Sequence, residues 1–179
     1  MRIKNSKDHF GVVAIFLHWL IALLIIGLLI LGLYMVELPI SLEKLKFYGW
    51  HKEYGLLVLG LAIIRLGWRL MNTTPELELP LLEKLAARAA HWTFYIFMFA
   101  MPITGWLITS AAGLPASFFG LFALPNLIAP NEELRHSFQE LHEWLGYGLI
   151  ATIAVHTAAA LKHHFINKDE ILRRMISSK

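Results

Sequence analysis

The stretch that decides the fold is FGVVAIFLHWLIALLIIGLLILGLYMV, residues 10–36, which contains no Asp, Glu, Lys or Arg over 27 positions. An α-helix needs about 20 predominantly apolar residues to cross the hydrocarbon core of a bilayer. The stretch is too long for the apolar part of a signal peptide, and no small-residue cleavage site follows it. It therefore predicts a first transmembrane helix over residues 10–36.

The composition of the whole chain favours the same class of protein. Of its 179 residues, 57% are hydrophobic and only 16% are charged, whereas a soluble domain carries about 25% charged residues. The net charge of +3 is too small to indicate nucleic-acid binding. The absence of cysteine excludes disulfides, iron–sulfur clusters, Cys-based zinc sites and a covalently attached c-type haem. A bound metal would have to be held by His, Met or carboxylate side chains.

Three further apolar segments predict three more transmembrane helices. Pro102 lies inside the third helix, where it predicts a kink. Several Gly and Pro residues between the third and fourth helices predict a long outer loop over residues 110–137. We therefore expect an all-α, membrane-spanning four-helix bundle that forms one domain over residues 1–179. The predicted helices cover residues 10–36, 50–70, 89–109 and 138–164.

Lys and Arg are distributed unevenly between the two sides of this bundle. Cytoplasmic segments of membrane proteins carry an excess of Lys and Arg. If both termini are cytoplasmic, that side holds twelve of these residues and the other side holds four. The sequence therefore predicts that both termini lie in the cytoplasm. The cytoplasmic set is Arg2, Lys4, Lys7, Arg65, Arg69, Lys84, Arg88, Lys162, Lys168, Arg173, Arg174 and Lys179, and the outer set is Lys44, Lys46, Lys52 and Arg135.

Four histidines lie within or at the ends of the predicted helices, where ionisable side chains are costly and usually functional. His142 and His156 share the last helix and are 14 positions apart. In an α-helix this spacing is about 21 Å of rise, and the two side chains point to within about 40° of each other. Because successive helices run antiparallel, His51 lies at the depth of His142, and His18 lies at the depth of His156. Two facing pairs at two depths predict the axial ligands of two b-type haems.

A second pattern singles out the same four histidines. A porphyrin that lies against a helix needs small residues one turn from its ligand. The residue four positions beyond each of these histidines is small, and the residue four positions beyond each of the other five is not. The small residues are Ala22, Gly55, Gly146 and Ala160.

Two arginines near the cytoplasmic end of the second helix are candidate partners of haem propionates. Arg65 follows His51 by 14 positions and therefore lies on nearly the same helix face. A buried arginine needs an anionic partner, and a propionate would serve. Arg69 fits either a propionate or a lipid headgroup.

His163 is a candidate contact of a quinone headgroup. It follows His156 by seven positions, so it lies near the same face and about 10 Å closer to the cytoplasmic surface. A histidine here fits either a quinone that is protonated on reduction or a lipid phosphate. The sequence does not separate His163 from His91 as the quinone contact, and His91 also fits a packing or hydrogen-bonding role.

Short motifs accompany these histidines: His18-Trp19, RLGWRL at 65–70, HEWLGY at 142–147, and HTAAALKHH at 156–164, which runs into NKDEILRRM. Together they resemble the bacterial cytochrome b561 family over almost the whole chain. The resemblance implies a four-helix, multi-pass protein of the bacterial inner membrane with two haems b. The haem ligands of the family match His18, His51, His142 and His156.

The resemblance also implies an oxidoreductase that carries electrons between a periplasmic donor and ubiquinone. A characterised activity of the family is the oxidation of superoxide to dioxygen with reduction of ubiquinone, and the quinone-site histidine of the family matches His163. An anionic donor such as superoxide is attracted by positive electrostatic potential, but the predicted outer side of this chain is not basic. Near the outer start of the last helix, Arg135 is outnumbered by Glu132, Glu133, Glu140 and Glu143. The donor is therefore left as superoxide or another periplasmic reductant.

Two other functions remain as alternatives. A di-haem membrane-anchor subunit of a larger dehydrogenase or hydrogenase shares the four-helix plan, and it would need a partner with iron–sulfur clusters. A transporter or metal carrier that uses the same histidines would need polar residues along a path at mid-membrane, whereas residues 22–33 and 56–64 are almost wholly apolar. We find no catalytic triad, and we expect contacts with lipid and quinone. The oligomeric state is open, with a homodimer among the alternatives.

Overall fold

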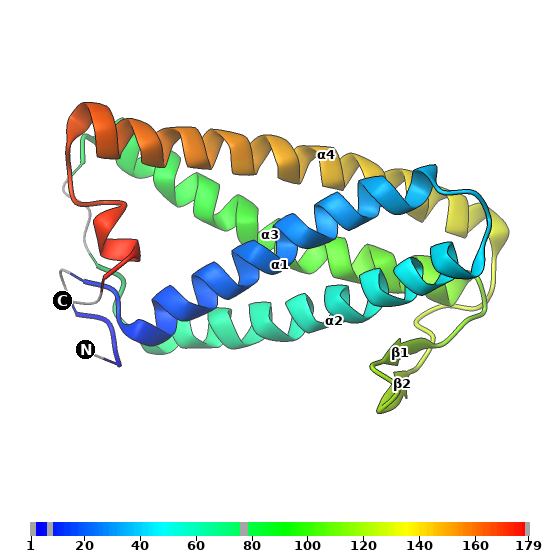
Figure 1. The fold of residues 1–179 in the computed structure, drawn as a ribbon. Coiled ribbons are helices and arrows are strands. Elements are labelled where there is room, and N and C mark those ends of the chain that lie inside the picture. Colours follow the sequence, from blue (N-terminus) through cyan, green and yellow to red (C-terminus); the bar gives the residue numbers. More distant parts are fainter. Residues whose placement is uncertain (1–2, 7–8, 76–78, 178–179) are drawn as a thin grey trace.

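The computed structural model describes residues 3–6, 9–75 and 79–177, and these form an antiparallel bundle of four long helices (Figure 1). Each helix is long and apolar enough to cross a membrane, with the last span running to Asn167. The prediction of an all-α transmembrane four-helix bundle is therefore confirmed. Both ends of the chain lie at the same end of the bundle. The helices are α1 (Val12–Glu37), α2 (Leu42–Met71), α3 (Leu81–Ala111) and α4 (Glu132–Lys162).

Three of the helices begin earlier than the hydropathy pattern predicts. The prediction was drawn from apolar segments, whereas the helices continue into the polar segments beyond the apolar core. At α2 and α4 a capping side chain sets the start, and at α3 the N-cap is Pro80, with no side-chain cap. The Ser41 side chain accepts a hydrogen bond from the backbone N–H of Lys44 at the start of α2. The Asn131 side chain accepts one from the N–H of Leu134 at the start of α4. The predicted starts at residues 50, 89 and 138 are corrected to 42, 81 and 132.

The outer connection between α3 and α4 contains a small β-hairpin, which the predicted irregular loop did not include. Strands β1 (Ala116–Phe118) and β2 (Phe122–Leu124) pair antiparallel. Phe119 and Gly120 form the turn with positive φ angles of 50° and 70°, a conformation that glycine adopts without strain. The hairpin packs over the outer part of α2, where the Phe119 and Tyr54 rings lie 5.2 Å apart.

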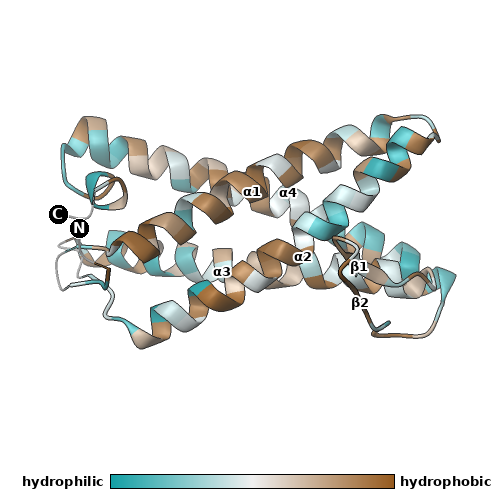
Figure 2. Ribbon diagram, turned by 60° about the horizontal axis from the view of Figure 1, so that its bottom comes forward, coloured by the Kyte–Doolittle hydropathy of each residue, from teal (hydrophilic) through white to brown (hydrophobic). Residues whose placement is uncertain are grey.

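The helices pack in chain order, with α1 on α2, α2 on α3 and α3 on α4. Among the described residues, α1–α4 and α2–α4 are not among the closely packed pairs. The buried core is small and is centred on Ile21, Ala62, Tyr95 and Met98. Many large apolar side chains face outward, and hydrophobic residues dominate the middle of the helices while hydrophilic residues gather at the ends (Figure 2). This is the distribution that a lipid environment stabilises.

Beyond α4 the helix widens into a π-helical turn, and the chain then reverses. Residues His163–Asn167 form a π-helical turn (η1), and Lys168 adopts a left-handed conformation with φ 55°. A short 3₁₀ turn follows at Arg173–Met175 (η2), and the Trp19 indole N–H donates a 2.7 Å hydrogen bond to the Met175 carbonyl. The C-terminal segment is therefore attached to the start of α1.

The predicted cytoplasmic location of both termini remains a prediction. The described basic residues assigned to that side belong to segments at the end of the bundle that carries the termini. These segments are the one before α1, the last part of α2, the first part of α3, and the end of α4 with the residues after it (Figure 1). Arg2, Lys7 and Lys179 lie outside the described residues.

Candidate functional site

Two of the four candidate ligands face each other near the end of the bundle opposite the termini, which the sequence predicts to be the outer end. The rings of His51 in α2 and His142 in α4 have centroids 6.2 Å apart and planes inclined by 73°. Two imidazoles on opposite sides of one metal ion, with metal–nitrogen bonds of about 2 Å, have centroids roughly 6 Å apart. The outer histidine pair therefore has the separation that axial ligation of one iron requires.

A threonine fixes the orientation of His142. The Thr104 hydroxyl oxygen lies 2.8 Å from Nδ1 of His142, and it donates to the backbone carbonyls of Ala100 at 2.8 Å or Met101 at 2.9 Å. Because the hydroxyl has one hydrogen, which a carbonyl takes, it accepts from the imidazole Nδ1–H. This tautomer leaves the lone pair of Nε2 free for a metal. The only sequence signal for Thr104 is a hydroxyl inside an apolar helix, and our sequence reasoning missed it.

The outer pair fits a haem in two further respects. The Nδ1 atom of His51 is buried and has no hydrogen-bond partner among the described residues, so this imidazole is not fully engaged by the chain. A glycine lies against each ring. A Cβ atom at Gly32 would lie 3.2 Å from Cε1 of His51, and one at Gly105 would lie 3.6 Å from Cε1 of His142. A side chain at Gly32 or Gly105 would therefore reduce the space around the imidazole ring beside it.

A second group of imidazoles lies near the end of the bundle that carries the termini. The rings of His18 in α1 and His156 in α4 have centroids 6.5 Å apart, with planes inclined by 66°. The His91 ring in α3 lies 6.2 Å from the same His156 ring. Distance alone therefore leaves two possible partners for His156.

Helix packing favours His18 over His91 as that partner. A flat porphyrin between two axial ligands needs room between the helices that carry them. The pair His18–His156 joins α1 to α4, and the outer pair joins α2 to α4; within the described part of the chain neither helix pair is closely packed. The pair His91–His156 joins α3 to α4, which pack directly against each other. His91 thus fits the packing role, beside His156.

The two arginines differ in their surroundings. Nη2 of Arg65 lies 3.2 Å from Nδ1 of His18. The guanidinium of Arg69 lies 5.9 Å from the ring centroid of Trp92 and 5.6 Å from that of Tyr95, which is cation–π geometry. Neither arginine has a carboxylate partner among the described residues. Arg65 therefore remains a half-buried cation, beside the inner histidine pair, that can accept an anionic group.

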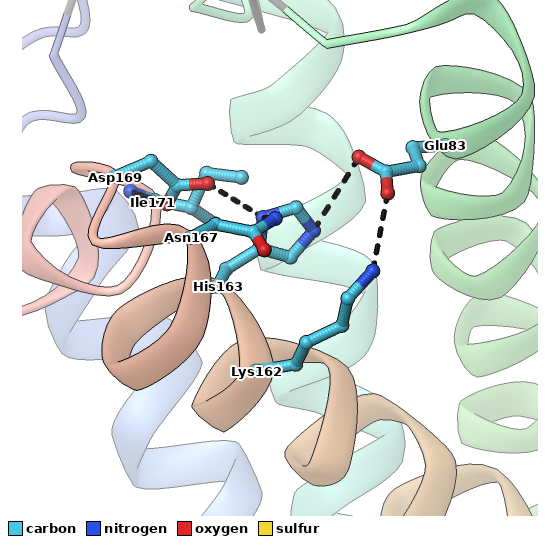
Figure 3. Close-up of polar contacts among 6 residues, drawn as sticks. All are labelled: Glu83, Lys162, His163, Asn167, Asp169 and Ile171. Carbon is cyan, nitrogen blue, oxygen red and sulfur yellow. Dashed lines mark hydrogen bonds and ion pairs between the residues drawn. The ribbon is translucent and has the colours of Figure 1, made fainter.

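His163 lies between two carboxylates that our sequence reasoning did not identify (Figure 3). Its Nδ1 is 2.5 Å from Oδ2 of Asp169, and its Nε2 is 3.9 Å from Oε2 of Glu83. Lys162 donates to the other Glu83 oxygen at 3.3 Å, and the Asn167 amide lies 3.2 Å from Nδ1. The sequence signal for Asp169 was the acidic pair in the NKDE motif, whereas Glu83 is distant in sequence and carried no signal.

A bare metal ion does not fit these groups. Within residues 3–6, 9–75 and 79–177, no cluster of three or more His, Cys, Asp or Glu side chains is placed to hold one. Each histidine pair offers two nitrogen ligands only. A haem completes such a pair, because its porphyrin supplies the other four nitrogen ligands of the iron.

Comparison with known proteins supports this interpretation. The family model for prokaryotic cytochrome b561 matches residues 9–178. The chain is similar to cytochrome b561 homolog 2 of Escherichia coli K12, with 36% identity over 98% of this chain and 95% of the relative. It is also similar to cytochrome b561 homolog 1 of that organism, at 27% identity over 94% of this chain and 97% of the relative. A third relative, the probable superoxide oxidase CybB of Yersinia pestis, is 29% identical over 91% of this chain and 93% of its own length.

These matches cover nearly the whole chain, and they confirm the resemblance that the histidine motifs indicate. Membership implies b-type haem as the cofactor, electron transfer as the activity and the inner membrane as the location. The chain therefore belongs to the prokaryotic cytochrome b561 family.

Proposed function

We propose that this protein is a di-haem cytochrome b that accepts electrons from superoxide on the periplasmic side and reduces ubiquinone on the cytoplasmic side. The observation that carries the proposal is the presence of two facing histidine pairs toward opposite ends of one membrane-spanning bundle. Bound haem b would supply reversible one-electron chemistry, which the protein tunes through its ligands and their surroundings. Two superoxide anions would be oxidised to dioxygen for each ubiquinone reduced to ubiquinol, with two protons taken up.

Each residue of the site has a distinct role in this proposal. His51 and His142 hold the outer haem, and Thr104 keeps the His142 ring in the tautomer that offers Nε2 to the iron. His18 and His156 hold the inner haem. The regular α-helix between His142 and His156 separates the two ligand levels by about 21 Å along its axis.

Three residues on the cytoplasmic side would complete the path. Arg65, beside His18, would pair with a propionate of the inner haem, and Arg69 would support it from the next turn of α2. His163 would bind the ubiquinone headgroup. The last assignment rests on its place beyond His156 and on the family resemblance.

Superoxide is the proposed donor because one relative is described as a probable superoxide oxidase. Electrostatic attraction contributes little to this proposal, because two of the four basic side chains assigned to the outer side, Lys44 and Arg135, are held by local contacts. Lys44 donates to the carbonyls of Val36 and Leu38, and Arg135 pairs with Glu132. Capture of the anion would therefore depend on access to the outer haem more than on long-range steering.

Removal of one ligand from each pair should remove one haem selectively. In His142→Ala the outer haem should be lost and in His18→Ala the inner one, because each iron loses one of its two axial imidazoles. The haem content per chain, measured after purification, should fall from two to one in both variants. His136→Ala, an exposed position in the same helix as His142, should retain two. Retention of both haems in His142→Ala or His18→Ala would refute the assigned pairs.

Enlargement of Gly32 should affect only the outer site. In Gly32→Val a side chain would press on the His51 ring, since even a Cβ there lies 3.2 Å from Cε1. We expect loss of the outer haem, or a shift of its reduction potential in a redox titration, while the inner haem is unchanged. Gly27→Val in the same helix is the matched control, because a Cβ at Gly27 meets nothing within 4 Å. Equal behaviour of the two variants would contradict the proposed outer site.

The purified protein should form ubiquinol when it is supplied with superoxide and ubiquinone. About one ubiquinol should appear for every two superoxide anions consumed, and the rate should change little with ionic strength because Lys44 and Arg135 are engaged in local contacts. If superoxide fails but another reductant drives ubiquinol formation, the donor assignment is wrong and the quinone assignment stands. If an iron–sulfur subunit co-purifies and is required, the membrane-anchor alternative is favoured.

A further inference from the structure

We propose that Glu83 and Asp169 act with His163 as a proton relay, which carries protons from the cytoplasmic surface to the quinone headgroup. The inference rests on the proposed function, since it concerns the protons that ubiquinone takes up when it is reduced. The relay would supply these protons at the cytoplasmic end of the proposed electron path.

The His163 ring occupies a position that suits proton transfer. Its side chain is only 12% exposed, whereas Glu83 and Asp169 are 34% and 30% exposed and therefore reach water. The two ring nitrogens face different carboxylates (Figure 3). The charged groups in contact with this ring are thus Asp169 from the C-terminal turn and Glu83 from α3, with Lys162 of α4 bound to Glu83.

The two carboxylates differ in how closely they engage the ring. Asp169 holds Nδ1 at 2.5 Å, whereas Oε2 of Glu83 lies 3.9 Å from Nε2, beyond hydrogen-bonding distance. Nδ1 is therefore committed to Asp169, and Nε2 remains available to donate to a quinone carbonyl oxygen. Glu83 is close enough to return a proton to the ring after a small side-chain movement.

The fold builds this arrangement from segments that are separate in the sequence. The π-helical turn η1 and the left-handed Lys168 bring Asp169 back onto His163, and the Asp169 N–H donates to the His163 carbonyl at 3.2 Å. The other Asp169 oxygen accepts from the N–H of Ile171 at 3.1 Å, which fixes the carboxylate. Glu83 comes from the first turn of α3 and is held by Lys162.

The His163 ring lies beside two carboxylates, those of Glu83 and Asp169, and the Lys162 ammonium group binds Glu83. In the proposed step, His163 gives the Nε2 proton to the quinone oxygen as the quinone receives an electron. Glu83 then passes a proton from water to the ring, and a second cycle completes ubiquinol. Two electrons and two protons enter each quinone.

The test compares Glu83→Gln and Asp169→Asn with the control Glu170→Gln. Glu170 is also acidic and adjacent to Asp169, but it pairs with Arg173. The measurements are the rate of ubiquinol formation, the rate of haem reduction by the donor, and the haem spectrum of the full-length holoprotein. We expect Glu83→Gln and Asp169→Asn to slow ubiquinol formation about tenfold or more, with haem reduction and spectrum unchanged.

Chemical rescue separates a proton relay from a structural clamp on the C-terminal segment. A small weak acid such as formic acid should restore much of the lost rate in Glu83→Gln, because it carries protons to the vacated position. If these carboxylates only held the C-terminal segment in place, formic acid would not restore the rate. Normal rates in both variants, an equal loss in Glu170→Gln, or a loss without rescue would overturn the relay. If the unmodified protein forms no ubiquinol, the proposed function itself fails. If the unmodified protein forms ubiquinol, and Glu83→Gln and Asp169→Asn form it as fast as the control Glu170→Gln, only the relay is wrong.

Discussion

The structure depends on the free-energy cost of placing an unpaired polar group in hydrocarbon. Because backbone N–H and C=O groups find no water there, each membrane crossing must be a helix that satisfies its own hydrogen bonds. The same cost applies to side chains, so every imidazole at membrane depth needs a partner or a ligand role. A neutral imidazole that binds iron meets this requirement without bringing a charge into the bilayer. The histidine pairs and the apolar surface thus follow from one constraint.

In helix α4, histidines placed at membrane depth also have the roles proposed for function. Its regular geometry sets the distance between His142 and His156, and both ligand pairs join it to a helix that does not pack closely against it. The helix widens into a π-helical turn where His163 meets Asp169. π-Helical turns are rare and are often found at functional sites, which agrees with the role proposed for this end of the bundle. One helix therefore carries the candidate groups for both haems and for the quinone.

Much of this arrangement was predictable because it depends on local spacing. Apolar segments predicted four spans, and the positions of His142 and His156 in one helix predicted two levels of candidate ligands. The structure places His51 beside His142 and His18 beside His156. The features that were not predicted depend either on caps and turns outside the apolar segments or on tertiary contacts. The starts of α2 and α4 are set by the capping residues Ser41 and Asn131, and the hairpin by a turn within the loop between α3 and α4. The contacts of Thr104 with His142 and of Glu83 with His163 join residues 38 and 80 positions apart, and no pattern in the sequence records them.

The central claim is that four histidines bind two haems, and its most direct test is the haem content of the purified protein. Oxidised and reduced absorption spectra should be recorded on the same sample as a quantitative haem and protein determination. The account predicts two haems b per chain, both low-spin, because each iron has two axial imidazoles. One haem per chain, or a high-spin spectrum from either haem, would contradict the assignment of His51 with His142 or of His18 with His156.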